Sequence, residues 1–398
     1  MIDDVRRARS RRAGFALAVV TLTAMMAGAS APSPFYPVLA ARIGFDTVAI
    51  TAVFAVYAGA LLLTLLTAGS LSDHVGRRPV TSGALVLLAA SIVVFWHADT
   101  VAWLLVARVI QGVASGLLLS SLSATVTDFE PPSRPGAAAV WNAVAPMVGL
   151  ASGALVSGLL LDNAGDAMAW VFAPLALLYL VLAVAAWFVP ESAARRPGAL
   201  ASLRLRFSVP RHMRALFLQA LPAIFAGWAT GGLFLSLGAS IVRTEFGGVA
   251  HIWQGLSVAL LAASGALSIV VARRFSARSV TIYGTSALAV GTGLSLVALS
   301  AGSLAGYLAA VLVAGTGFGT GFFGVVRLLI PHIPAAERAD VFASIFLASY
   351  TAFGLPAVIA GISVELVGLT PVVYGYGVVV IVLASAAAVL RWREKTAG

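Results

Sequence analysis

The sequence has no cysteine, a single lysine and few charged residues of any kind. Without cysteine the chain can form no disulfide and no thiolate metal site. Charged residues make up 10% of the 398 residues, whereas ordinary soluble domains contain roughly 25%. This shortage excludes a soluble enzyme or nucleic-acid-binding domain, so the formal net charge of +10 does not indicate a nucleic-acid partner.

Apolar residues dominate instead, at 60% of the chain with a mean hydropathy of +1.00. A helix needs about 20 apolar residues to cross a bilayer, so the length accommodates about a dozen spans. An outer-membrane barrel is disfavoured, because the apolar stretches are long runs without period-two alternation. The pattern predicts an all-α membrane protein with twelve transmembrane helices. They are expected at 13–40, 48–68, 79–97, 101–127, 137–161, 168–189, 214–241, 250–272, 279–300, 304–329, 339–366 and 371–391.

The first apolar segment has two interpretations. An Arg-rich start, an apolar stretch and Ala27-Gly28-Ala29 resemble a signal peptide with its cleavage site. The other interpretation is a first transmembrane helix that continues through Pro32, Pro34 and Pro37. We favour the helix, because removing it would leave eleven spans and break the six-plus-six division described below.

The distribution of Lys and Arg predicts the orientation, because these residues concentrate in cytoplasmic loops. With a cytoplasmic N-terminus, only Arg42 and Arg243 fall on the outer side, and Arg108 and Arg327 fall inside spans. All the others lie on the inner side, within 6–12, 77–78, 134, 195–214, 273–278, 338 and 391–395. We therefore expect both termini in the cytoplasm.

An Arg-rich segment at 190–213 separates two groups of six spans, so we expect bundles at 1–189 and 214–398 joined by a cytoplasmic linker. Parallel repeats of this kind are a known transporter architecture. Short matches between the halves keep the same order while their offset drifts slowly, which favours duplication. They are Arg78-Pro79-Val80-Thr81 with Arg278-Ser279-Val280-Thr281 (offset 200), Gly112 and Gly116 with Gly315 and Gly319 (203), Arg134 with Arg338 (204), and Gly149-Leu150 with Gly354-Leu355 (205).

The loop after the second span reads Gly69-Ser-Leu-Ser-Asp73-His-Val-Gly76-Arg77-Arg78. An Asp at a membrane boundary is costly unless it is paired, and Arg77 follows Asp73 by four residues. We expect Gly69 to let a neighbouring backbone approach and Gly76 to permit a tight turn.

This loop resembles the G-x-L-small-D-x-x-G-R-R/K loop of the major facilitator superfamily, and the twelve-span layout extends the resemblance over the whole chain. The resemblance implies a transporter that works by alternating access. It also implies a gating latch, in which Asp73 and Arg77 tie the two halves together on the cytoplasmic side in the outward-open state. The plainer alternative is that Arg77 and Arg78 only set topology, which leaves Asp73 and the glycines unexplained.

Three further stretches bear on the transporter type. Arg108-x-x-Gln111-Gly112-x-x-x-Gly116 resembles a pattern of drug-exporting members, although Gly112, Gly116 and Ser120 also suit close helix packing. In the fifth span, only Pro146 and Gly149 match the exporters' G-P-x-x-G-G gating pattern, and a small-residue packing face explains them equally well. Pro190-Glu191-Ser192 resembles the tail of sugar-carrying members or is a simple helix stop.

The carboxylates lie at loops and helix ends rather than inside spans. Proton-coupled carriers need a carboxylate whose pKa a cavity can shift, and the nearest candidates for proton coupling are Asp46 and Glu365. Asp46 is also a good N-cap for the second span. The five histidines have no metal-ligand spacing, so we expect neither metal nor cofactor.

Arg108 falls inside the fourth span, where an unpaired Arg is too costly to face lipid. Gln111 and Ser115 share its face of the helix, so we expect a polar stripe that lines a wet cavity and contacts an anionic or polar group of the substrate. The alternative is a structural Arg108 that donates to carbonyls of a partner helix. The remaining candidates for substrate binding are aromatic or weakly polar residues: Tyr57, Trp141, Asn142, Gln219, Trp228, Phe318, Phe346 and Tyr350.

These features favour a monomeric secondary transporter of the bacterial inner membrane, not an enzyme, which exports a small lipophilic or drug-like solute in exchange for protons. An importer or facilitator of a small nutrient with the same fold is the alternative. A non-transporting receptor or intramembrane enzyme is disfavoured, because no catalytic dyad or metal pattern is present and the Asp73 loop is complete.

Overall fold

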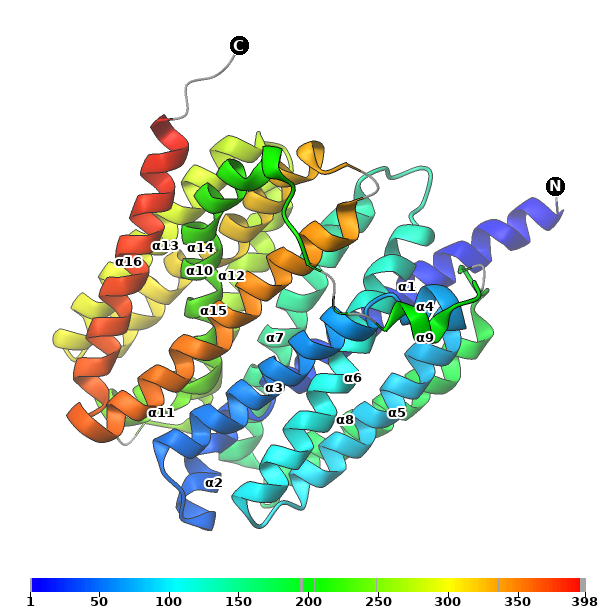
Figure 1. Ribbon diagram of the computed structural model, residues 1–398. Coiled ribbons are helices and arrows are strands. Elements are labelled where there is room, and N and C mark those ends of the chain that lie inside the picture. The colour runs from blue at the N-terminus through cyan, green and yellow to red at the C-terminus, as the bar shows by residue number, and fades with distance from the viewer. Residues whose placement is uncertain are drawn as a thin grey trace.

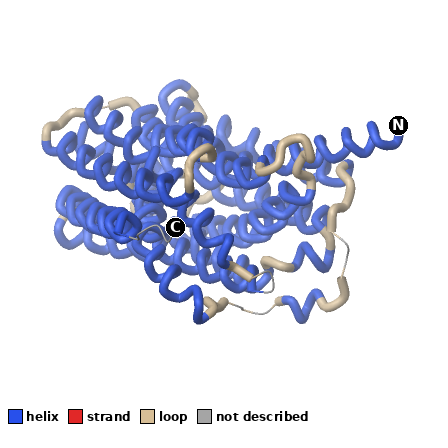
Figure 2. The backbone as a smooth tube through the Cα atoms, turned by 90° about the horizontal axis from the view of Figure 1, so that it is seen from above, coloured by secondary structure: helices blue, strands red, loops and turns tan. Residues whose placement is uncertain are grey.

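The computed structural model describes residues 2–193, 196–203, 205, 207–247, 249–334 and 337–393. This part of the chain contains helices and loops only, as Figure 2 shows. Outside it lie four of the basic residues assigned above to the inner side: Arg195, Arg204, Arg206 and Lys395. The α-helices are α1 (Ile2–Ser30), α2 (Tyr36–Ile43), α3 (Thr47–Ala68), α4 (Leu71–Val75), α5 (Arg77–Trp96), α6 (Val101–Asp128), α7 (Ala137–Asn163), α8 (Ala167–Ala185), α9 (Ala199–Ser202), α10 (Arg214–Ser236), α11 (Gly238–Phe246), α12 (His251–Ala272), α13 (Ala277–Ser300), α14 (Leu304–Leu329), α15 (Arg338–Val367) and α16 (Leu369–Arg393).

Twelve helical segments within the described residues are long and apolar enough to cross a membrane, which confirms the predicted spans. The first runs from Arg9 to Ile43 and includes both α1 and α2. A short 3-10 turn at Ser33–Phe35 joins these two helices, because the prolines there cannot supply the backbone N–H groups of a continuous α-helix. The segment that resembled a signal peptide is therefore part of a helix packed against α6 and α7.

We call the spans before the predicted linker, α1–α8, the first half and those after it, α10–α16, the second half. In the first half α6 packs against α3 and α5, and α1 packs against α7. In the second half α14 packs against α13 and α12, and α10 packs against α15 and α16. The principal contacts between the halves are those of α7 with α12 and of α3 with α15. In Figure 1, α3 and α15 run side by side at the centre of the molecule.

Equivalent glycines allow equivalent helices to pack closely in the two halves. A Cβ on Gly112 of α6 would lie 2.6 Å from the Tyr57 carbonyl oxygen of α3, and a Cβ on Gly315 of α14 would lie 2.4 Å from the Leu261 carbonyl oxygen of α12. Gly315 follows Gly112 by 203 residues and Leu261 follows Tyr57 by 204. The offset found in the sequence therefore also relates the packing of α6 on α3 to that of α14 on α12.

The bundle has two ends, which we name by the chain termini. At the terminal face α1 begins and α16 ends; in Figure 1 these two ends lie at the right and at the upper left. The opposite face carries the connections from α2 to α3, α5 to α6, α7 to α8, α11 to α12, α13 to α14 and α15 to α16. Within the described residues, every hydrogen bond between the halves lies at the opposite face. The halves are thus joined at that face in this conformation.

The packing of α6 on α3 predicts the effect of a single methyl group. Gly112→Ala should lower the thermal midpoint of the full chain, because over-packing a close helix contact costs about 1–3 kcal/mol. The matched control is Gly83→Ala in α5, where a Cβ meets nothing within 4 Å and Ala is the better helix former. A thermal melt of the purified variants measures both effects. Equal midpoints for the two variants would contradict the close approach of α6 to α3.

Candidate transport site

Arg108 lies in the interior of the first half with 1% of its surface exposed. Its guanidinium donates to Gln111 Oε1 at 2.5 Å and to the Tyr36 hydroxyl. The rings of Tyr36, Tyr57 and Phe95 surround it, with their centroids 5.4 to 5.6 Å from the guanidinium carbon. Aromatic faces attract a cation, and more so once it has lost its water. We call Arg108 with these three rings and Gln111 the Arg108 cage.

The cage surrounds the Arg108 guanidinium with rings and amide or hydroxyl oxygens. Within the described residues, Arg108 makes no salt bridge to a carboxylate, and its Nε is buried without a hydrogen-bond partner. Gln111 donates onward to the Gly28 carbonyl oxygen of α1 at 2.9 Å. Arg108 therefore bonds to side chains while Gln111 bonds to a backbone carbonyl, an arrangement that differs from the structural alternative predicted for Arg108.

Ser115 shares the buried face of α6 with Arg108 and Gln111, as the polar stripe predicted. Its hydroxyl is buried and lies beside the Tyr57 hydroxyl of α3. Water does not reach this stripe in the present conformation, because the cage rings cover Arg108. That the stripe lines a wet cavity in another conformation stays a prediction.

Aromatic residues of both halves meet beside the cage. Phe54 lies one helical turn from Tyr57 on α3, and its ring centroid is 4.7 Å from that of Phe353 on α15. Trp228 of α10 contacts Tyr350 at 4.9 Å and Phe353 at 5.7 Å. Tyr57, Trp228 and Tyr350 are among the cavity residues predicted from the sequence, whereas Phe54 and Phe353 are not.

The other predicted binding residues are more scattered. Phe346 stacks near Tyr350 with centroids 6.5 Å apart, at the edge of the aromatic group. The Asn142 amide donates to the Ser123 carbonyl oxygen at 3.2 Å within the first half. Trp141 is exposed, and Gln219 is half-buried near the terminal end of α10. A ligand role for these residues stays a prediction.

Asp46 and Glu365, the predicted proton-coupling residues, meet at the opposite face. Asp46 Oδ1 accepts from the Ala49 amide at 2.8 Å, which confirms its role as the N-cap of α3. Glu365 Oε1 accepts from the Thr47 amide at 3.2 Å. Both carboxylates are exposed and lie far along their helices from the midpoint of the bundle. Their part in proton transfer is untested.

The signature loop forms a charged cluster at the terminal face of the first half. Arg77 Nη2 lies 2.6 Å from Asp73 Oδ1, which confirms the predicted pair, and Arg77 Nε lies 3.6 Å from Asp128 Oδ2 at the end of α6. Ser192 donates to the same Asp128 oxygen at 2.7 Å. These residues all precede α9, so the predicted latch between the halves does not form through them in this conformation and stays a prediction.

Glu191 holds the start of α5. Its carboxylate accepts from the Arg77 amide at 2.8 Å and from the Arg78 amide at 3.1 Å, two of the helix-start donors that have no partner within the helix. Gly76, at φ 111°, makes the turn before them, and a Cβ there would lie 2.7 Å from Glu191 Oε2. Both the backbone angle and the carboxylate thus require glycine at this position. Glu191 follows α8, so its segment is more than a helix stop.

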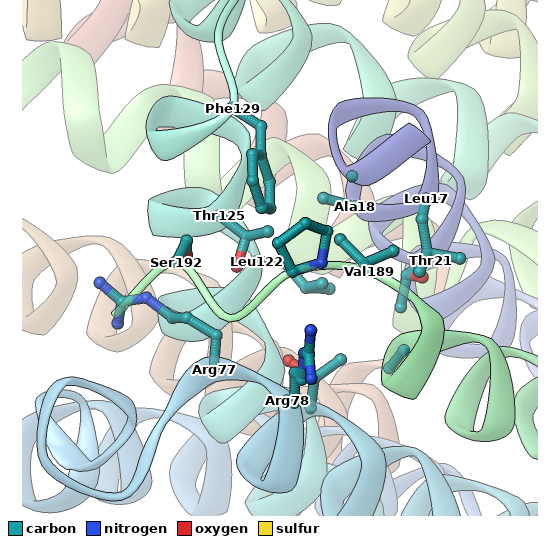
Figure 3. Close-up of a pocket in the computed structure, with 14 residues that line it drawn as sticks. Leu17, Ala18, Thr21, Arg77, Arg78, Leu122, Thr125, Phe129, Val189 and Ser192 are labelled. Carbon is teal, nitrogen blue, oxygen red and sulfur yellow. The ribbon is translucent and has the colours of Figure 1, made fainter. Parts of the chain in front are cut away.

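A small pocket lies behind this cluster, between α1, α5, α6 and the segment after α8. In Figure 3 the Arg78 side chain points into it beneath the segment with Val189 and Ser192. Thr21, Thr81 and Thr125 add hydroxyl groups to a mostly apolar lining. All the residues that line the pocket precede α9, so it does not lie between the halves.

Two gating expectations differ in detail from the structure. Gly69 was expected to admit a neighbouring backbone, but a Cβ there would meet only the Leu65 carbonyl of the preceding turn. Gly149 does lie against another backbone, because its Cβ would be 2.2 Å from the Thr23 carbonyl oxygen of α1. Pro146 stands inside α7 one turn earlier. The α7 glycine thus has a packing role, as the alternative interpretation proposed.

Comparison with known proteins identifies the class of this molecule. A family model described as Major Facilitator Superfamily matches residues 17–355. The chain therefore belongs to the Major Facilitator Superfamily, whose members are transporters and not enzymes. The match covers the signature loop, the Arg108 cage and the aromatic group between the halves.

Curated relatives match shorter stretches. An uncharacterized MFS-type transporter, YhjO of Bacillus subtilis, is 31% identical over 159 residues, which are 39% of each chain. The inner membrane transport protein YnfM of Escherichia coli is 29% identical over 51% of this chain and 48% of its own. The multidrug resistance protein MdtL of a Shewanella species is 34% identical over 20% of each chain. This chain thus aligns with half or less of these relatives' length.

The contact of Glu191 with the start of α5 predicts that removing its carboxylate lowers the stability of the chain and leaves the Arg108 cage intact. Glu191→Ala should destabilise the chain by about 1–2 kcal/mol, the usual cost of removing a helix cap. Glu191→Gln should lose less, because the amide oxygen still accepts one of the two bonds. Asp99→Ala, which removes an exposed carboxylate from a loop, is the control. A thermal melt measures the three variants. If Glu191→Ala and Asp99→Ala have the same thermal midpoint, Glu191 does not stabilise α5.

Proposed function

We propose that this chain exports a small lipophilic or drug-like solute across the bacterial inner membrane by alternating access of its two halves, in exchange for protons. The terminal face is then cytoplasmic, as the concentration of Arg in its loops favours. A conformation whose halves bond at the opposite face corresponds to an inward-facing carrier. The multidrug resistance proteins among the relatives support the solute class.

The observation that carries this proposal is the line of rings from the Arg108 cage to the second half. Tyr57 belongs to the cage, and Phe54 beside it on α3 contacts Phe353. Trp228 and Tyr350 extend the same aromatic surface in the second half. A solute bound here would touch both halves, so it could stabilise one arrangement of them over the other, as a transported substrate must.

The chemistry of this surface determines the solute class. Rings offer large apolar area and tolerate varied shapes, which suits a lipophilic solute better than a sugar or a phosphate. The charge in the cage adds one site for an anionic or polar group, because Arg presents a planar fork of donors. The charge also raises the energy of a cation or free proton at the centre of the bundle.

Substitution at Arg108 tests the role of the cage charge. Arg108→Ala should abolish transport while the protein still inserts, and Arg108→Lys should recover only part, because Lys lacks the planar fork. Arg134→Ala, at an exposed loop position, should transport like the parent chain. Uptake of labelled substrate at equal expression measures all three. Full transport by Arg108→Ala would remove Arg108 from the mechanism.

Transport in oriented membranes tests direction and coupling. Inverted vesicles energised with a proton gradient should accumulate labelled lipophilic compounds, and a protonophore should stop this. Accumulation in right-side-out cells instead would favour the importer. If transport persists when both the pH gradient and the membrane potential are dissipated, proton exchange is wrong and a facilitator replaces it.

A further inference from the structure

Two carboxylates bind across the boundary between the halves at the opposite face. Asp162 stands in the last turn of α7 and contacts the start of α12 in the second half. Its Oδ1 accepts from the His251 amide at 2.9 Å and lies 2.8 Å from His251 Nδ1, and its Oδ2 accepts from the Ile252 amide at 2.7 Å. Glu365, in the last turn of α15, reaches the Thr47 amide at the start of α3 in the first half.

These contacts are equivalent under the repeat. Glu365 follows Asp162 by 203 residues, and His251 follows Thr47 by 204. The packing of Gly112 and Gly315 on their partner helices shows the same two offsets. Each half therefore places an acid on the start of a helix of the other half, at equivalent positions. We call the two contacts the clasps.

The first amides of a helix have no partner within it, and the helix dipole favours a negative charge there. A clasp pairs the carboxylate with these amides only while the ends of the two halves touch. When the opposite face opens, the acid and the amides must return to water. The clasps consequently stabilise the arrangement that is closed at this face over the one that is open.

Beside the Asp162 clasp, closing the contact between α7 and α12 also has an unfavourable free-energy contribution. Gly158 and Gly255 bring α7 and α12 close together, with a Cβ on Gly255 placed 2.3 Å from the Ala154 carbonyl oxygen. The neighbouring Ser157 hydroxyl and Gln254 Oε1 are buried without hydrogen-bond partners. Leaving such atoms unsatisfied opposes burial. The hydrogen bonds of the clasp favour closure of this contact, and the unsatisfied buried atoms oppose it. The contact can therefore open again.

We infer that Asp162 and Glu365 are the gate residues of the opposite face, and that they set how often it opens. This inference rests on the proposed alternating access. It assigns to Glu365 a conformational role in place of the proton-transfer role expected from the sequence. Arg243 adds a third contact, donating to the Pro37 carbonyl oxygen at 3.1 Å, but it has no equivalent in the repeat.

The chain offers matched controls for both clasps. Asp166 lies on the same face as Asp162 and caps α8 within its own half, accepting from the Ala169 amide at 3.0 Å. Glu245 of α11 accepts from the Thr370 hydroxyl at 2.5 Å within the second half, so it is the matched control for Glu365. Asp162→Asn and Glu365→Gln therefore remove a charge between halves, whereas Asp166→Asn and Glu245→Gln remove the same charge inside one half.

Spin-label distances in the purified full chain measure the two arrangements without any substrate. Because the chain has no cysteine, labels can be placed through Ala102→Cys with Ala301→Cys at the opposite face. Ser133→Cys with Arg274→Cys reports on the terminal face. All four positions are exposed and the two members of each pair belong to different halves.

Each clasp substitution should shift the ratio of open to closed opposite face by about tenfold, the effect of one hydrogen bond to a charged group. The double variant should shift it further. The opposite-face distance should lengthen as the terminal-face distance shortens, while both controls keep the parent distribution.

Three results would overturn the inference: unchanged distances in the double variant, an equal shift in the controls, or lengthening at the opposite face with no change at the terminal face. The last would indicate local loosening rather than a gate. Failure of the parent chain to transport any solute would contradict the proposed function alone, because these distances are measured without a solute.

Discussion

A polar group inside a membrane-spanning bundle must find its partner within the chain, because lipid offers none. This constraint explains the least expected parts of the molecule. Among the residues that the structure describes, no acid pairs with Arg108, and three aromatic rings with one amide take the place of water. The starts of α5, α12 and α3 likewise use carboxylates from distant segments. The polar contacts between distant segments described above are thus either buried or at helix ends.

The same constraint shapes the boundary between the halves. Glycines whose backbones touch pack the helices within each half, and Gly158 with Gly255 makes the same kind of contact between α7 and α12. Aromatic rings, and carboxylates at the opposite face, also join the halves. These polar and aromatic contacts can be exchanged for water or for a bound solute. The proposed alternating access requires a boundary of this reversible kind.

The sequence predicted the features that depend on local pattern. Runs of apolar residues located the twelve spans, and the Asp46 cap, the Asp73–Arg77 pair and the Gly76 turn follow from neighbours along the chain. The repeat offset anticipated the equivalent glycine contacts of α6 and α14.

Contacts between distant segments were not predictable. Tyr36 meets Arg108 across 72 positions, and Glu191 meets Arg77 across 114. Which turn of one helix faces which turn of another depends on packing that no single segment encodes. For this reason the sequence did not indicate the contacts of Phe95, Phe353 and Asp162, or that the atoms nearest a Cβ on Gly69 belong to Leu65 of its own chain segment.

The most direct test of the account is whether water reaches the polar stripe of α6 when the halves rearrange. Ser115→Cys is nearly isosteric and introduces the sole thiol of the chain. We expect a small water-soluble thiol reagent to modify it during transport, although the site is buried in this conformation. Ser91→Cys, equally buried in α5 away from the boundary, should stay unmodified. If the thiol at position 115 is as unreactive as the one at 91 in every transport state, the stripe does not line the path and the central site lies elsewhere.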